Sequence, residues 1–107
     1  MKLQQKSQFE QEFEQKFQEL AAEWRKETEM LSLVSQMAAH PAYQKIIEIG
    51  KPVIPLLLKE LETEPDYWFW ALREITGENP IQPEQKGRLK QMAQAWVQWG
   101  KERGYQW

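Results

Sequence analysis

The stretch that decides the fold runs from Asp66 to Pro80 and reads DYWFWALREITGENP. The i, i+3, i+4, i+7 spacing of a buried helix face is met by Trp68, Ala71, Leu72 and Ile75. Asp66 is the expected N-cap of this helix, and Gly77 is the expected residue at its end. The four successive aromatic side chains at 67–70 would point to every side of a helix. We therefore expect this helix to pack against neighbours on more than one side, as the central helix of a small bundle.

Length and composition limit the classes of protein that the chain can represent. The 107 residues suffice for one domain, residues 1–107, and the charged N-terminal segment has no apolar core of a signal peptide. No cysteine is present, which excludes disulfides, cysteine-ligated zinc and cysteine nucleophiles. Every apolar run is too short to span a bilayer. We expect a soluble cytoplasmic protein without a membrane segment.

Residues 4–31 predict one long amphipathic helix. Its apolar positions share one arc at about 100° per residue, and they are Phe9, Phe13, Phe17, Leu20, Trp24 and Leu31. Two interpretations remain open. The stripe can lie on the rest of the domain along its whole length. Alternatively, its N-terminal half projects and offers the Phe9–Phe13 ridge to another chain.

Four further helical segments are expected over residues 30–39, 41–49, 52–63 and 84–103. The segment 30–39 is either a short helix or the tail of the helix over 4–31. The His40-Pro41 dipeptide separates the first two, since a residue before proline avoids the helical region and proline suits a helix start. The helix over 52–63 is apolar over a wide arc, as expected of a buried helix. Small residues at Ala93 and Gly100 predict close approach of the last helix to a neighbour.

Residues 40–80 resemble a HEAT-type helical hairpin of the short kind found in small bacterial HEAT-like proteins. The matching features are Ile46 and Gly50 before Pro52 and its leucines, then Ala71-Leu72 and Thr76-Gly77. The resemblance implies an all-α fold and a bacterial source, but no activity. HEAT units stack in arrays because a single unit cannot bury both of its faces. The flanking segments 1–39 and 81–107 must therefore cover this hairpin, which completes a small all-α helical bundle.

No group of residues predicts chemistry. His40 is the sole histidine, and a general base needs an oriented partner that no nearby serine, threonine or carboxylate provides. We interpret it as a loop or capping residue. A metal needs several convergent ligands, which the sequence does not space. The acidic residues over 60–66 are typical of a solvated loop. We predict no catalytic residues, no cofactor and no metal, and so no enzyme.

The leading hypothesis is a non-enzymatic protein–protein interaction module, with an inhibitor, antitoxin or adaptor as its subtypes. Trp, Tyr and Arg are enriched at binding hot spots. The candidate partner-binding residues are Phe9, Phe13, Tyr67, Trp70, Arg73 and Trp107. Burial by the last helix remains the alternative for Tyr67, Trp70 and Arg73. The expected partner is another protein chain, or a second copy bound through the N-terminal helix.

The alternative hypothesis is a nucleic-acid-binding accessory protein. Residues 81–107 carry five positive and two negative side chains, and the basic ones are Lys86, Arg88, Lys90, Lys101 and Arg103. Trp96 and Trp99 could stack on bases. However, both tryptophans fall on the core-facing arc of the last helix, and the net charge of −2 disfavours a general nucleic-acid binder.

Overall fold

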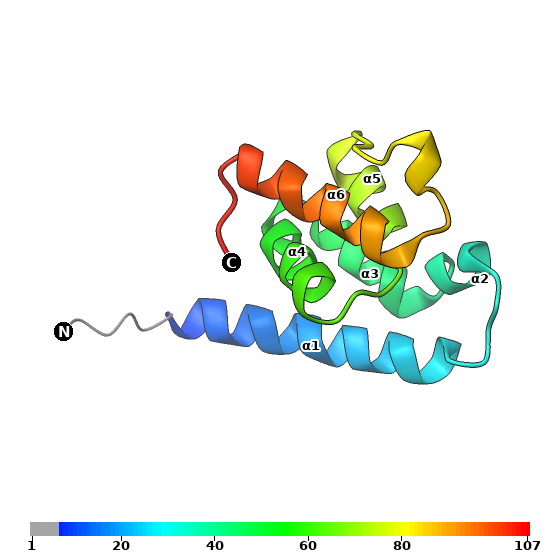
Figure 1. Cartoon of the computed structure of the whole chain (residues 1–107). Helices are drawn as coiled ribbons and strands as arrows, with labels where there is room; N and C mark the ends of the chain where they lie inside the picture. The colour runs from blue at the N-terminus through cyan, green and yellow to red at the C-terminus, as the bar shows by residue number, and fades with distance from the viewer. Residues whose placement is uncertain (1–6) are drawn as a thin grey trace.

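The computed structural model describes residues 7–107, which form six α-helices and no strand (Figure 1). These residues are 72% helical, which confirms the all-α prediction. The helices are α1 (Gln8–Thr28), α2 (Val34–Ala38), α3 (Pro41–Ile49), α4 (Ile54–Thr63), α5 (Phe69–Thr76) and α6 (Leu89–Glu102). Two 3-10 turns, Lys51–Val53 and Pro83–Gln85, precede α4 and α6. The predicted start of the first helix at residue 4 lies outside the described residues.

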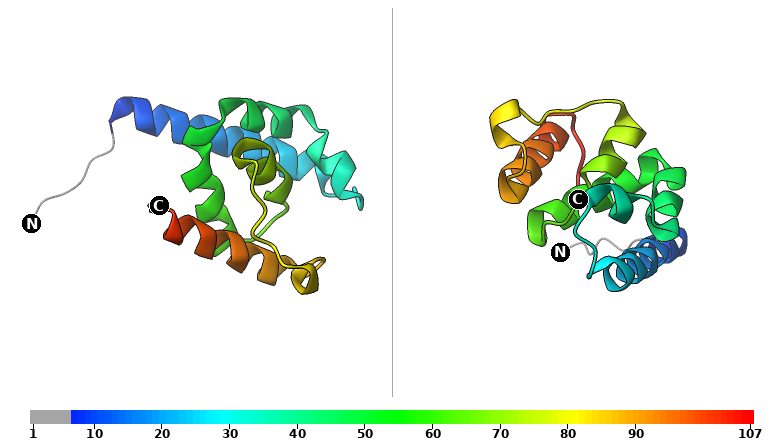
Figure 2. Two further views of the ribbon diagram at one scale, coloured as in Figure 1. Left: turned by 90° about the horizontal axis from the view of Figure 1, so that it is seen from above. Right: turned by 90° about the vertical axis from the view of Figure 1, so that its right-hand side faces the viewer.

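Helices α1 and α6 lie on opposite sides of α3, α4 and α5 (Figures 1 and 2). Helix α1 packs on α3, α3 packs on α5, and α4 packs on α6. The helix in the middle is therefore α3, and the prediction that the aromatic helix is central was wrong. The reason is that the buried side chains of α3, Ala42, Tyr43 and Ile46, lie between α1 and α5.

The side chain at the centre of the core nevertheless belongs to the aromatic stretch, and it is Trp68. Trp68 is fully buried, and its ring centroid lies 4.4 Å from that of Trp24, 5.5 Å from Tyr43 and 5.9 Å from Phe17. These partners come from α1 and α3, so one side chain joins both helices to the start of α5. Tilted and stacked aromatic pairs at such distances add to the energy of burial.

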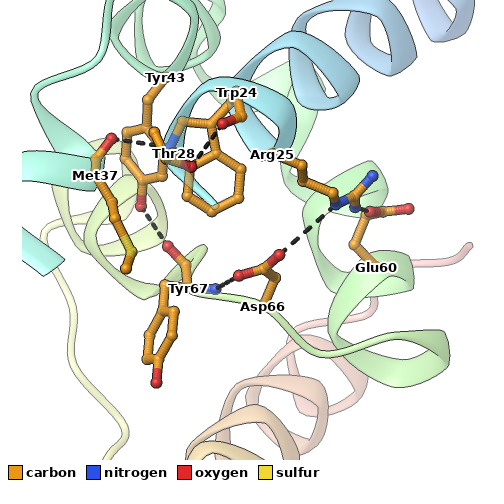
Figure 3. A network of polar contacts seen from close by, with 8 residues as sticks. All are labelled: Trp24, Arg25, Thr28, Met37, Tyr43, Glu60, Asp66 and Tyr67. Atoms are coloured by element: carbon orange, nitrogen blue, oxygen red, sulfur yellow. Dashed lines mark hydrogen bonds and ion pairs between the residues drawn. The ribbon is translucent and has the colours of Figure 1, made fainter. Parts of the chain in front are cut away.

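Asp66 does not cap α5, as the sequence had predicted. The helix begins at Phe69, and the Asp66 carboxylate instead accepts from the N–H of its neighbour Tyr67 at 2.8 Å. The role of the cap falls to Tyr43 of α3. Its hydroxyl donates to the Tyr67 carbonyl at 2.9 Å (Figure 3). The same hydroxyl accepts from the Ala71 N–H at 3.0 Å. A side chain 28 residues away thus satisfies one of the free N–H groups of the first turn.

Polar contacts also attach α1 to its neighbours (Figure 3). The Arg25 guanidinium is paired with Glu60 of α4, and its Nε lies 3.7 Å from Asp66 Oδ2. The indole N–H of Trp24 donates to the Met37 carbonyl at 2.8 Å, which fixes α2 against α1. The carboxylate of Asp66 therefore belongs to the junction between α1 and the loop before α5.

Several helix ends differ from the predictions. Helix α1 ends at Thr28, so Leu31 lies outside it and is exposed. Helix α6 begins at Leu89 rather than at 84, because Gly87 with φ of 80° separates it from the preceding turn. At its end, Gly104 has φ of 84°, and the Tyr105 N–H donates to the Gly100 carbonyl at 3.0 Å. This Schellman turn directs the tail back over α6.

Gly100 allows α6 to approach α4, as predicted. A Cβ atom at this position would lie 2.5 Å from Leu58 Cδ1 and 3.2 Å from the Trp107 ring. Gly100→Val is expected to lower the free energy of unfolding by about 2 kcal/mol, since overpacking a filled core costs about 1–3 kcal/mol. Urea denaturation checks this. Gln98→Val, on the exposed side of α6, controls for placing a β-branched side chain in this helix, and equal losses in the two variants would contradict the account.

Candidate functional site

An apolar groove lies between the first turns of α1, the start of α4 and the C-terminal tail. Its volume is about 420 Å³. We call it the Phe9 groove, and its apolar lining consists of Phe9, Phe13, Pro52, Pro55, Leu56 and Trp107. Glu10, Glu14 and Lys59 add charges to the lining. Three predicted partner-binding residues, Phe9, Phe13 and Trp107, thus converge on one groove.

The α1 wall of the groove is fixed by the first turn of the helix. Ser7 Oγ accepts from the Glu10 N–H at 3.1 Å, and Glu10 Oε1 accepts from the Ser7 N–H at 3.2 Å, which forms a capping box. Along the ridge, Phe17 is buried, Phe13 is half-buried and Phe9 is 78% exposed. The stripe of α1 therefore belongs to the core at Phe17 and reaches the surface at Phe9.

The opposite wall is the docked C-terminal tail. The Trp107 ring lies over Gly100, and its indole N–H donates to Glu62 Oε1 at 2.9 Å. Tyr105 stacks on Trp99 with a centroid separation of 5.5 Å. The turn at Gly104 therefore places Trp107 beside α4, where it completes the groove.

Two other candidate residues lie on a separate surface. Trp70 is 42% exposed and, with Arg73, lines a cleft of about 240 Å³ along the exposed side of α5. Tyr67 lines neither depression. It is half-buried, and its ring meets Phe69 edge-on at 6.3 Å. The six candidates are thus divided between the Phe9 groove, the α5 cleft and the edge of the core.

Sequence reasoning missed an apolar corner at the other end of α1. Met30 is 91% exposed and Leu33 is 56% exposed, and Leu31 and Val34 are exposed beside them. We call these four residues the Met30 corner. The sequence carries one signal for it, because no Asp, Glu, Lys or Arg occurs from 30 to 44.

His40 caps a helix, as predicted, but the expectation that no carboxylate lies beside it was wrong, because the fold brings Glu27 of α1 next to it. Its Nδ1 accepts from the Ala42 N–H at 3.0 Å at the start of α3, and its Nε2 lies 2.6 Å from Glu27 Oε1. Glu23 brings a third potential metal ligand, since ligand atoms of Glu23, Glu27 and His40 lie within 4.8 Å of one another. With Nδ1 accepting, Nε2 carries the proton and donates to Glu27. This tautomer leaves no nitrogen lone pair for a metal.

The basic end of α6 is engaged by acidic side chains. Arg103 donates to Glu78 through both terminal nitrogens, at 2.7 and 2.5 Å, and Trp99 Nε1 donates to the same carboxylate at 3.1 Å. These hydrogen bonds, first from Arg103 and then from Trp99, lower the pKa of Glu78. Trp96 is fully buried and Trp99 nearly so. Neither indole is available to stack on a base.

The lowered pKa of Glu78 predicts a pH-dependent stability. A carboxylate of this kind stabilises the folded state above its unfolded pKa of about 4.3, and the contribution is lost as the pH falls through the folded pKa. We expect the melting temperature of the wild type to exceed that of Glu78→Gln at neutral pH. The difference should shrink as the pH falls below the unfolded pKa. Glu84→Gln, at an exposed position, is the control. A difference independent of pH would contradict this role of Glu78.

Comparisons with known protein families, with curated proteins and with solved structures found no match for this chain. Among residues 7–107, none of the helices has the length and apolar character needed to cross a membrane.

Proposed function

We propose that the protein is a non-enzymatic docking module that holds an apolar segment of a partner chain in the Phe9 groove. The observation that carries the proposal is the 78% exposure of Phe9 at the edge of an apolar groove of about 420 Å³. An exposed aromatic side chain beside a rigid apolar depression is the arrangement of a binding hot spot.

The groove is built before any partner arrives. Its walls are a capped helix, two prolines and a tryptophan held by a hydrogen bond to Glu62. A preorganised groove binds more tightly because little conformational entropy is lost on association. Its volume suits a few side chains of an amphipathic helix or an extended segment.

The other predictions from the sequence differ in the support that they have. The burial of Trp96 and Trp99 counts against the nucleic-acid alternative. An inhibitor, antitoxin or adaptor in a bacterial cytoplasm fits a small groove-bearing domain. The HEAT-like interpretation of residues 40–80 stays a prediction.

Site-specific photo-cross-linking tests the proposal. A benzophenone side chain replaces Phe9 in one variant and Gln91, on the exposed side of α6, in the control. After irradiation in the native extract, adducts are identified by mass spectrometry. The proposal expects a defined protein adduct at position 9 that is absent at position 91. The same adducts at both positions, or none at position 9, would overturn it.

A further inference from the structure

A second groove lies between the end of α4 and the exposed side of α6. Its volume is about 510 Å³, and it shares no lining residue with the Phe9 groove. We call it the α6 groove, and its apolar floor consists of Leu61, Pro65, Ala93 and Val97. Leu61 and Ala93 are buried, whereas Pro65 and Val97 are partly exposed. Pro65 and Val97 therefore offer apolar surface to a side chain from outside.

A lysine stands at each end of the α6 wall of this groove. Lys90, Gln94, Val97 and Lys101 line the groove from α6. Their spacing places them within an arc of about 60° at about 100° per residue. The two lysines are separated by about 16 Å along the helix axis at 1.5 Å per residue. The α6 wall therefore has a cation at either end and an apolar residue between them.

The charge of this wall is entirely positive. No Asp or Glu occurs over residues 85–101, where the charged residues are Lys86, Arg88, Lys90 and Lys101. Among residues 7–107, the Lys90 ammonium has no ion pair or hydrogen bond. The Lys101 side chain is 59% exposed, and its Nζ lies 3.6 Å from Glu62 Oε2. Both lysines can therefore meet a carboxylate from another chain.

Glu62 is the carboxylate that the described residues contribute to the lining, and it is already engaged. Its Oε1 accepts from the Trp107 indole at 2.9 Å, and its Oε2 faces Lys101. Glu64 is exposed in the adjoining loop and does not line the groove. A lysine ammonium has three donors, so Lys101 can hold a second carboxylate beside Glu62. The lining thus keeps a net positive charge.

We infer that the α6 groove binds an acidic amphipathic helix of another protein. Carboxylates at positions i and i+11 of such a helix are also separated by about 16 Å, so they reach both lysines at once. Apolar side chains at i+4 and i+7 lie on the same face of that helix and cover Pro65 and Val97. This pattern is the same in both directions, so either orientation of the helix satisfies it.

The apolar floor favours a protein over a nucleic acid as the partner. Binding of a single strand combines cations along its backbone with aromatic rings on which the bases stack. The α6 groove has apolar side chains beside its lysines, and the rings of Trp96 and Trp99 are buried. Opposite charges steer the acidic helix to the groove, and the apolar contact adds the burial.

Fluorescence anisotropy with the purified full chain and two labelled, alanine-rich helical peptides tests the inference. The acidic peptide carries Glu at i and i+11 and Leu at i+4 and i+7. The basic peptide has Lys in place of both Glu residues. We expect the acidic peptide to bind with a dissociation constant of about 10–100 μM. The basic peptide should bind at least about tenfold more weakly.

Charge reversal in the groove identifies the contact. Lys90→Glu and Lys101→Glu should each weaken binding of the acidic peptide by about threefold to tenfold. The double variant should prefer the basic peptide, a gain that loss of folding cannot produce. Lys45→Glu, on the exposed side of α3, changes the net charge as each single variant does and should leave both affinities unchanged.

Three results would overturn the inference. The first is an acidic peptide that does not bind at millimolar concentration, and the second is unchanged binding in the double variant. The third is a mixed-sequence single-stranded DNA that binds more tightly than the peptide and loses affinity in Lys90→Glu. In each case a position-9 adduct would leave the proposed function standing, because the two grooves share no lining residue.

Discussion

Trp68→Ala is expected to lower the free energy of unfolding by about 3–5 kcal/mol, the usual cost of removing a buried aromatic side chain. Trp68 is fully buried and contacts three rings from two other helices. Small domains are stable by about 5–15 kcal/mol, so this single change brings the chain close to unfolding. Urea denaturation followed by circular dichroism at 222 nm measures the loss.

Trp70→Ala is the matched control for this prediction. It removes the same side chain two positions away, where the indole is 42% exposed and lines the α5 cleft. We expect it to cost about 1 kcal/mol or less, since less apolar surface is returned to water. Equal losses at 68 and 70 would show that Trp68 is not the centre of the core.

Tyr43→Phe is expected to cost about 2–3 kcal/mol although the ring remains. The variant leaves the Ala71 N–H and the Tyr67 carbonyl without their partner, and an unpaired buried polar group costs about 1–3 kcal/mol. Burial raises the pKa of the Tyr43 hydroxyl, so it stays protonated and donates to Tyr67 throughout the working pH range. Chemical denaturation measures the loss.

Amide hydrogen exchange separates a capping role from simple packing. In Tyr43→Phe, protection of the Ala71 amide should fall more than protection of amides in α6. Tyr67→Phe, which removes a hydroxyl from a half-buried ring, is the control. A uniform fall in protection across the molecule would contradict the view that Tyr43 acts as the cap of α5.

The buried positions of the stretch 66–80 could be predicted from the sequence, because the spacing of apolar residues within a helix is a local property. Trp68, Ala71 and Leu72 are buried, as their spacing indicates, and Ile75 is partly buried at the edge of the core. The start of α5 was not predictable in the same way, since its cap is supplied by Tyr43 from another helix. An Asp before a helical pattern favours an N-cap, but Asp66 bonds to its neighbour and lies near Arg25 instead.

The Phe9 groove was predictable only in part. The sequence indicated the Phe9–Phe13 ridge and the terminal Trp107 as separate features. Their convergence depends on the turn at Gly104 and on the absence of a side chain at Gly100, which together place the tail beside α4. The Met30 corner depends on the end of α1 at Thr28, which no proline or glycine marks.

The decisive measurement compares Phe9→Ser with Gln8→Ser by thermal unfolding and by fluorescence-detected sedimentation of the labelled protein, alone and in its native extract. We predict that Phe9→Ser shifts the melting temperature by only about 1–3 °C, because the side chain is largely exposed. The same variant should lose the faster-sedimenting complex that Gln8→Ser retains. If Phe9→Ser instead unfolds the protein, or if its complexes match those of Gln8→Ser, Phe9 is not the anchor of a docking site.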